Sequence, residues 1–321
     1  MRAVYAQTQS AEDPISGLKV GEFDAPQPPE GFRRVRVKAS ALNHHDLWSL
    51  QGVGLAADAL PMVLGCDAAG IDDDGNEVIV HGVISSPGWE GDETLDPKRS
   101  LLSERLPGAM ADEVWVPARN LVPKPAELSF EEAACLPTAW LTAYRMLFTV
   151  NPAAPGSTIL VQGAGGGVAT ALISLASAAG YRVWATSRSA EKREHALKLG
   201  AEQAFEAGAR LPERVDTVFD SVGEATWAHS LKSLKPGGAV VTCGATSGPN
   251  PPADLNRVFF LQLRVLGSTM GTRAELVRLV NFLVATGVRP EIDSVLPLEE
   301  AEKGFRKMHD GDVMGKIVFR H

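Results

Sequence analysis

The architecture of this 321-residue chain is indicated most clearly by the stretch Thr158-Ile159-Leu160-Val161-Gln162-Gly163-Ala164-Gly165-Gly166-Gly167-Val168-Ala169. An apolar run of strand length meets a cluster of glycines, and the residues after the cluster have helical periodicity. Glycine at positions 163, 166 and 167 leaves out the Cβ atoms that would hold a phosphate away from the backbone N–H groups of the following helix. The pattern predicts a strand, a phosphate-binding turn and a helix, which is typical of a dinucleotide site and favours an oxidoreductase.

The next residues complete a strand–helix–strand unit. The predicted helix carries small side chains at Ala169, Ala171 and Ala176, which suit close packing on a sheet. It ends at Gly180, and the apolar run 181–186 then predicts a second buried strand. A glycine-rich turn without a ligand in an ordinary α/β protein is the alternative to a nucleotide site.

Length, charge and cysteine content limit the possible classes of protein. A chain of 321 residues is longer than a single hydrophobic core usually supports, so two domains are expected. The net charge of -8 argues against nucleic-acid and anionic-membrane partners. Cys66, Cys135 and Cys243 form no CxxC pair and no disulfide framework. No apolar run approaches the ~20 residues of a membrane span, and the chain opens on a strand-like pattern, so we expect a soluble cytoplasmic protein.

The pattern along the chain changes twice. Residues 1–123 are rich in short alternating segments between turns, which predicts a small irregular barrel, with the charged stretch 85–106 as a surface loop. Residues 124–287 alternate between strands and helices, which predicts a doubly wound parallel sheet. Residues 288–321 return to β-like segments, and we expect them to rejoin the first domain.

Four segments together resemble the medium-chain dehydrogenase/reductase superfamily, and within it the zinc-free quinone oxidoreductase-like branch. They are residues 39–47 (ASALNHHDL), 64–70 (LGCDAAG), 133–144 (AACLPTAWLTAY) and the glycine turn itself. The resemblance covers nearly the whole chain. It implies an α/β protein with a GroES-like β-rich catalytic domain, a Rossmann domain with a doubly wound parallel sheet, and an active site in the cleft between them.

The resemblance also bears on zinc. In the alcohol dehydrogenases of this superfamily a catalytic zinc takes Cys, His and Cys at positions that here hold Asn43, Cys66 and Thr138. Asparagine and threonine are poor zinc donors. Neighbouring residues on extended chain point to opposite sides, so at most one of His44 and His45 would face a metal. The cysteines of a structural zinc site are missing from residues 85–108, and we expect no metal.

The loss of zinc changes the expected chemistry. Zinc polarises simple carbonyls and activates alkoxides, so unactivated alcohols become poor substrates without it. Quinones and α,β-unsaturated carbonyls need only hydrogen bonds to the carbonyl oxygen while the charge develops. The sequence therefore predicts hydride transfer to a quinone or enone.

The end of the second strand predicts which nicotinamide is used. An acid there would bind the adenosine ribose and repel a 2′-phosphate, but this chain has Ser187 followed by Arg188. Arg188 and Lys192 lie at the start of the next predicted helix, where a cation is unfavourable unless an anion accompanies it. We therefore predict NADPH; two solvated surface cations are the alternative.

Candidate site residues follow from the matching positions. The resemblance places Asn43 and Thr142 at the nicotinamide, Thr138 beside it and Lys316 at the pyrophosphate. For proton delivery or carbonyl binding the candidates are Asn43, His44, His45 and Asp46. In the alternative, Asp46 caps a helix, a histidine packs on that helix, and solvent supplies the proton. The candidate cofactor-binding residues are Thr138, Thr142, Gly163, Gly166, Gly167, Val168, Ser187, Arg188, Lys192, Cys243, Gly244, Ala245, Ser268, Thr269 and Lys316.

Two other functions and a partner surface remain open. An NADPH-binding redox sensor or scaffold with little turnover would share the cofactor site. A zinc-dependent alcohol dehydrogenase with unusual ligands is the third reading. Trp48, Phe259 and Phe260 either shape an acceptor pocket or belong to the core. Quinone reductase relatives commonly form homodimers through their Rossmann sheets, and the apolar run 258–266 is the expected edge.

Overall fold

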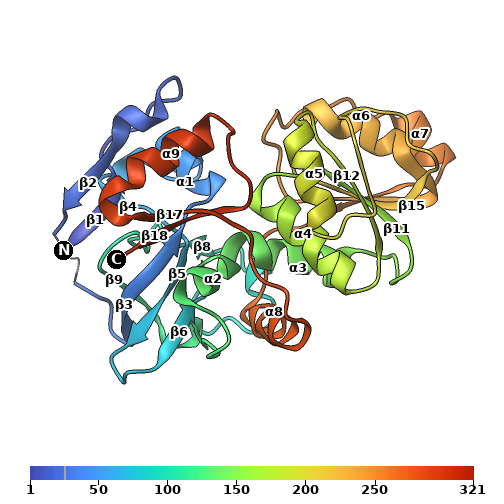
Figure 1. Ribbon diagram of the computed structural model, residues 1–321. Helices are drawn as coiled ribbons and strands as arrows, with labels where there is room; N and C mark the ends of the chain where they lie inside the picture. The colour runs from blue at the N-terminus through green and yellow to red at the C-terminus, as the bar shows by residue number, and fades with distance from the viewer. Residues whose placement is uncertain (25–26) are drawn as a thin grey trace. The chain divides into compact units, whose positions relative to one another are not determined.

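A computed structural model describes residues 1–24 and 27–321 (Figure 1). The chain divides into two compact units, which are described separately: unit 1 is Met1–Leu141 with Gly271–His321, and unit 2 is Thr142–Met270. Among the described residues, no helix combines the length and apolar character needed to cross a bilayer.

The units differ from the predicted boundaries at both junctions. Residues 124–141 and 271–287 fall in unit 1, although sequence pattern assigned them to the second domain. Helix α2 (Phe130–Ala134) packs on β3 and β5, and α8 (Arg273–Thr286) packs on β10, all of which are unit 1 strands. Helical periodicity can indicate that a segment is a helix, but it cannot say which sheet the helix covers.

Unit 1 is built on a seven-stranded sheet in the order β10-β6-β5-β3-β18-β17, with β9 also paired to β3. A three-stranded sheet (β2-β1-β4) and a two-stranded sheet (β7-β8) accompany it. The strands are β1 (Arg2–Ala6), β2 (Leu18–Glu22), β3 (Phe32–Ala41), β4 (Met62–Val63), β5 (Asp67–Asp72), β6 (Glu77–Val80), β7 (Val83–Ile84), β8 (Ser100–Leu101), β9 (Glu113–Pro117), β10 (Leu121–Pro123), β17 (Ile292–Pro297) and β18 (Lys316–Arg320).

Two apolar clusters form the core of unit 1. One lies among the strands of the large sheet and includes Val35, Val80 and Val114. The other lies under α1 (His44–Leu50) and α9 (Ala301–His309), which contact each other although they are far apart in the sequence (Figure 1). The predicted return of the C-terminal segment to the first domain is thus seen in β18, which pairs with β3.

The stretch 85–106 is less of a surface loop than its composition indicates. Leu102 and Ser103 are fully buried. Asp96 organises the stretch, since its carboxylate accepts hydrogen bonds from the backbone N–H and hydroxyl of Ser86 and from the N–H of Lys98. Further along the stretch, Leu102 lies beside Cys66, since the Cys66 thiol donates to the Leu102 carbonyl at 3.1 Å.

Unit 2 contains the predicted doubly wound sheet. Its six strands are parallel in the order β13-β12-β11-β14-β15-β16, the order of dinucleotide-binding sheets. The elements are α3 (Leu141–Arg145, which crosses the junction), β11 (Thr158–Gln162), α4 (Gly167–Ala178), β12 (Arg182–Thr186), α5 (Ala190–Lys198), β13 (Gln203–Phe205), β14 (Val215–Asp220), α6 (Glu224–Ser233), β15 (Leu234–Thr242), α7 (Leu255–Phe260) and β16 (Arg264–Gly267).

Candidate functional site

The parallel register of unit 2 aligns the ends of five strands. Thr186, Gln162, Asp220, Thr242 and Gly267 are successive partners in one row across the sheet. The residue after each strand therefore lies on the same carboxyl edge, where open α/β sheets bind ligands. This row brings together four groups of predicted cofactor residues, those beginning at positions 163, 187, 243 and 268.

The glycine turn has room for a ligand at the start of α4. Gly163 has a φ of +82°, which favours glycine. Gly166 is exposed and caps α4, and a Cβ built on it would meet no protein atom within 4 Å. Space is therefore open at the N-terminus of this 12-residue helix, and a helix N-terminus is the kind of place where a phosphate can bind.

The end of β12 presents one uncompensated cation. Arg188 is exposed, and no described residue forms an ion pair with it. Its loop is held from behind by Arg193, which donates hydrogen bonds to the carbonyls of Ser187 and Arg188. Ser189 caps α5 by accepting from the Lys192 N–H. Sequence pattern missed the supporting role of Arg193, because a hydrogen bond from an arginine side chain to the carbonyls of a preceding loop has no characteristic residue pattern.

The residues that follow β15 and β16 have small or polar side chains. Cys243, Gly244 and Ala245 follow β15, and burial raises the pKa of the Cys243 thiol to about 12, so this thiol is not a nucleophile at neutral pH. The Ser268 N–H donates to the Thr242 carbonyl at 2.8 Å, which anchors residues 268–269 to the same edge.

A buried charged network occupies the ends of three unit 1 strands. Ala41 pairs with both Asp67 and Val318, so the end of β3 lies beside the starts of β5 and β18. Lys316 is 2% exposed, and its ammonium donates to the Leu42 carbonyl (2.8 Å), Asn43 Oδ1 (2.6 Å) and Asp67 Oδ2 (3.1 Å). Long-range strand pairing therefore assembles an ion pair that no local motif predicts.

This network gives Asn43 and Lys316 partners other than those implied by the resemblance. The three N–H groups of Lys316 are all used inside unit 1, rather than on a pyrophosphate. The Asn43 amide accepts from Lys316 and donates to Asp67 Oδ2 at 2.8 Å and more weakly to the Ala41 carbonyl. Both side chains are therefore positioned as parts of the framework.

Helix α1 orders the three neighbouring candidates. The helix starts at His44, and Asp46 at its third position accepts a hydrogen bond from the Asn43 N–H at 2.9 Å. The other oxygen of Asp46 accepts from the Gly65 N–H at 3.0 Å. Burial raises the pKa of Asp46 to about 6, although the Asn43 N–H opposes this shift. Asn43 is therefore the N-cap residue of α1, and Asp46 lies inside the helix as the second member of the capping box rather than at the cap itself.

The two histidines differ sharply in their surroundings. His44 is exposed and meets Trp48 edge-on, with ring centroids 6.2 Å apart. His45 is mostly buried: its Nδ1 lies 3.4 Å from Cys66 Sγ and its Nε2 lies 3.2 Å from Glu104. Glu104 was not among the sequence candidates, since only folding of the 102–104 loop brings it to the histidine.

The cysteine and histidine influence each other. Burial raises the pKa of the Cys66 thiol. Burial also acts against charge on His45, but the sulfur of Cys66 and the carboxylate of Glu104 raise its pKa above the ordinary value. The pKa of Glu104 is lowered by its hydrogen bonds from His45 and the Leu101 N–H, against the effect of burial. Glu104 is therefore an ionised acceptor for the His45 Nε2–H.

Thr138 and Thr142 lie in neighbouring helical segments. Thr138 is in the π-helical turn Leu136–Trp140 of unit 1, and Thr142 is in α3. The Thr138 hydroxyl is buried and has no hydrogen-bond partner among the described residues. Thr142 is 6% exposed.

The residues do not fit a catalytic zinc at the three positions that the resemblance implies. The Asn43 amide is committed to Asp67 and Lys316, and Thr138 offers only a neutral hydroxyl. A different donor set does converge nearby: one ligand atom each from His45, Asp46 and Cys66 lie within 4.8 Å of one another. In this set, His45 and Asp46 of α1 take the place of residues 43 and 138 as donors.

Two family models match the chain, one to each predicted half. The Alcohol dehydrogenase GroES-like domain matches residues 30–126, and the Zinc-binding dehydrogenase model matches residues 167–285. A solved structure described as an NAD-dependent alcohol dehydrogenase is 34% identical, with full coverage of both chains and a TM-score of 0.91. The chain belongs to the medium-chain dehydrogenase/reductase superfamily. The expected combination of a GroES-like and a Rossmann-like domain is confirmed.

Curated relatives of this medium-chain dehydrogenase/reductase include more than one kind of oxidoreductase. An alcohol dehydrogenase from Geobacillus stearothermophilus is 29% identical over 94% of this chain and 96% of its own length. An acryloyl-coenzyme A reductase from Metallosphaera sedula is also 29% identical, over 94% of this chain and 96% of its own length. The family assignment thus supports an oxidoreductase activity, but it does not identify the hydride acceptor.

Proposed function

We propose that this medium-chain dehydrogenase/reductase transfers hydride from NADPH to a quinone or an α,β-unsaturated carbonyl compound, without a catalytic zinc. The observation that carries the proposal is the carboxyl edge of unit 2. It combines an open glycine at 166 with the unpaired cation Arg188 where the second strand ends. A pyrophosphate and a 2′-phosphate are the anions that suit these two places.

The nicotinamide supplies the hydride when it is bound, and the protein supplies orientation. The backbone N–H groups at the start of α4 receive the pyrophosphate, and Arg188 binds the 2′-phosphate. The backbone after β15 and β16 lies along the same edge, so residues 243–245 and 268–269 support the remainder of the cofactor. Thr142 belongs to the same unit and completes the proposed cofactor site.

His44 is the best placed of the four catalytic candidates to meet a substrate. Asn43, His45 and Asp46 are held by partners within unit 1, whereas the His44 ring is exposed. Neighbouring groups bury much of the surroundings of this accessible ring, and this burial together with the charge of Lys316 lowers the pKa of His44. A neutral imidazole can donate one N–H to a carbonyl oxygen. Solvent then supplies the proton to the reduced product.

The preference for a conjugated acceptor rests on the missing zinc donors. Without a metal at positions 43, 66 and 138, a simple carbonyl has no strong electrophile to polarise it. A conjugated acceptor delocalises the charge that hydride transfer creates. The similarity to a protein named acryloyl-coenzyme A reductase supports this class of acceptor.

Turnover by metal-stripped protein tests the proposal. We expect chelator-treated protein to oxidise NADPH with 9,10-phenanthrenequinone or small enones and to leave simple alcohols unoxidised. Absorbance of NADPH measures the rate, and elemental analysis verifies removal of zinc. Binding of NADPH without oxidation across this panel would instead support the redox sensor. Activity that returns only with zinc would support the zinc-dependent alcohol dehydrogenase, which the donor set at His45, Asp46 and Cys66 favours.

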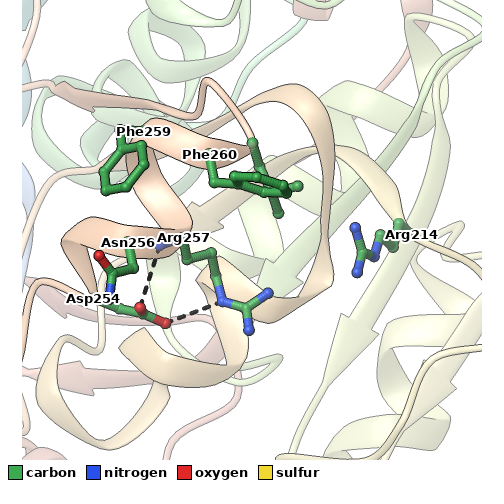
Figure 2. A pocket seen from close by; sticks show the side chains of 7 residues that line it. Arg214, Asp254, Asn256, Arg257, Phe259 and Phe260 are labelled. Atoms are coloured by element: carbon green, nitrogen blue, oxygen red, sulfur yellow. Dashed lines mark hydrogen bonds and ion pairs between the residues drawn. The ribbon is translucent and has the colours of Figure 1, made fainter.

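We also propose that two copies pair along β16. This strand is at one edge of the unit 2 sheet, and Val265 is 48% exposed. Phe259 and Phe260 on α7 are 67% and 80% exposed, so they do not belong to the core. Figure 2 shows them beside a hollow that Arg214 also lines, with Arg257 bonded to Asp254. This mixture of exposed apolar and charged groups is typical of a protein interface.

A charge placed on this surface is expected to separate the copies. We expect Phe260→Asp to shift the protein from dimer to monomer in light scattering after size exclusion, because a buried unpaired carboxylate is unfavourable. Leu95→Asp, at a leucine that is 68% exposed in unit 1, should leave the dimer intact. Wild-type protein that is monomeric at micromolar concentration would contradict the proposed pairing.

A further inference from the structure

We infer that Gln162 and Thr186 are positioning residues, whose side chains set the spacing between the glycine turn and Arg188 and thereby the preference for NADPH over NADH. The inference deepens the proposed function and rests on it, because it concerns how the same cofactor edge of unit 2 recognises its ligand. Each of the two side chains is only 1% exposed, so their role is to hold the edge rather than to contact the cofactor.

Three polar side chains lie side by side where the sheet of unit 2 reaches its carboxyl edge. Gln162 is the register partner of both Thr186 and Asp220, so the ends of β12, β11 and β14 are adjacent. All three residues are buried. A buried polar group is unfavourable unless it is hydrogen-bonded, and an apolar residue at any of these positions would avoid that cost. The hydrogen bonds of this row therefore need a reason beyond packing.

These hydrogen bonds run in one direction, which fixes the orientation of the Gln162 amide. The Ser230 hydroxyl donates to the Asp220 carboxylate at 2.6 Å, because an ionised carboxylate can only accept. Ser230 Oγ therefore accepts from Gln162 Nε2 at 3.0 Å. The amide oxygen then faces β12, where it accepts from the Thr186 hydroxyl at 2.6 Å. Gln162 thus ties the ends of β11 and β12 together.

His229 on α6 holds the same amide from another side. Its Nε2 lies 2.8 Å from the Ala209 carbonyl and must be the donor in that contact. In the neutral ring Nδ1 is then an acceptor, and it receives the second N–H of Gln162 at 2.8 Å. Two independent neighbours therefore give the amide one orientation, and both of its N–H groups and its oxygen have partners.

The residues that follow this row belong to the two phosphate sites of the proposed function. Gly163, directly after Gln162, begins the glycine turn, and its N–H lies 3.5 Å from Thr186 Oγ1. Arg188 is two residues beyond Thr186 on the neighbouring strand. NADPH has to reach both sites at once, whereas NADH has no 2′-phosphate to place. A fixed distance between the two strand ends therefore favours NADPH, because a small misplacement weakens a charge-assisted contact.

Removal of a single hydroxyl tests this role. Thr186→Val has nearly the same shape but cannot donate to Gln162. We expect it to raise the Kd of NADPH about 5- to 10-fold and that of NADH less than about twofold. Thr186→Ser keeps the hydroxyl and should restore the wild-type values. Fluorescence titration with both nucleotides gives the ratio of the two constants, which a loss of stability alone does not change.

Thr217→Val is the matched control. Thr217 is fully buried in the same sheet, and its hydroxyl donates to Asn151 Oδ1 at 2.8 Å. Its register partner is Ile159, three residues before the carboxyl edge. We expect Thr217→Val to lower the melting temperature about as much as Thr186→Val and to leave both Kd values unchanged. An equal loss of NADPH preference in this control would attribute the effect to sheet stability and would overturn the inference.

A double variant shows whether Thr186 acts through Arg188. In Arg188→Ala the contact with the 2′-phosphate is already gone, so the spacing no longer affects it. Adding Thr186→Val should then raise the Kd of NADPH less than about twofold further, since the two effects are coupled. Full additivity of the two substitutions would mean that the hydroxyl acts elsewhere, which contradicts the inference.

The wild-type titration keeps this inference distinct from the proposed function. Wild-type protein that binds NADH as tightly as NADPH would reject the proposed cofactor and this inference with it. A wild-type preference for NADPH that persists unchanged in Thr186→Val rejects only the positioning role and leaves the proposed function standing.

Discussion

Lys316→Met is expected to lower the free energy of unfolding of unit 1 by about 3 to 5 kcal/mol, the cost of breaking a buried ion pair by removal of one partner. The lysine and Asp67 are 2% and 0% exposed, and their charged atoms are 3.1 Å apart. Without the ammonium, the Asn43 amide is the remaining side-chain partner of the Asp67 carboxylate among the residues that the structure describes. Urea unfolding at neutral pH, followed by far-ultraviolet circular dichroism, measures the effect.

A double variant shows whether charge is the cause. Lys316→Met combined with Asp67→Asn removes both charges, and we expect it to recover at least half of the lost stability. Arg306→Gln is the surface control, because its ion pair with Glu302 is more than half exposed and is expected to contribute at most about 0.5 kcal/mol. A loss below about 1 kcal/mol for Lys316→Met would mean that the ion pair is not what stabilises this strand junction.

Arg188→Ala is expected to weaken NADPH binding by about 1.5 to 3 kcal/mol, or roughly 10- to 150-fold in Kd. The reason is loss of the charge-assisted bonds to the 2′-phosphate. NADH lacks that phosphate, so its Kd should change less than about twofold. Fluorescence titration with both nucleotides measures the two constants.

Arg182→Ala is the matched control for the cofactor prediction. Arg182 lies at the opposite end of the same strand and pairs with Glu202 and Glu213, so its loss should change neither constant. Equal weakening of NADPH and NADH in Arg188→Ala would contradict the 2′-phosphate role.

Local sequence pattern was sufficient to predict secondary structure wherever the residues of a single segment determine it. The apolar run and glycines at 158–169 predicted β11, the turn and α4, because strand and helix periods and the freedom of glycine act over a few residues. Alternation of strands and helices also predicted the parallel sheet. Its carboxyl edge then gathers residues 163, 187, 243 and 268, which was foreseeable since parallel strands end together.

The partners of buried polar groups depended on tertiary structure instead. Lys316 meets Asp67 only because β18 and β5 both pair with the end of β3, which joins residues about 250 positions apart. Glu104 reaches His45 only through the folded 102–104 loop, and α2 and α8 pack in unit 1 rather than unit 2. Periodicity says which face of a segment is apolar, whereas the choice of neighbour is made by packing and burial of charge across the whole unit.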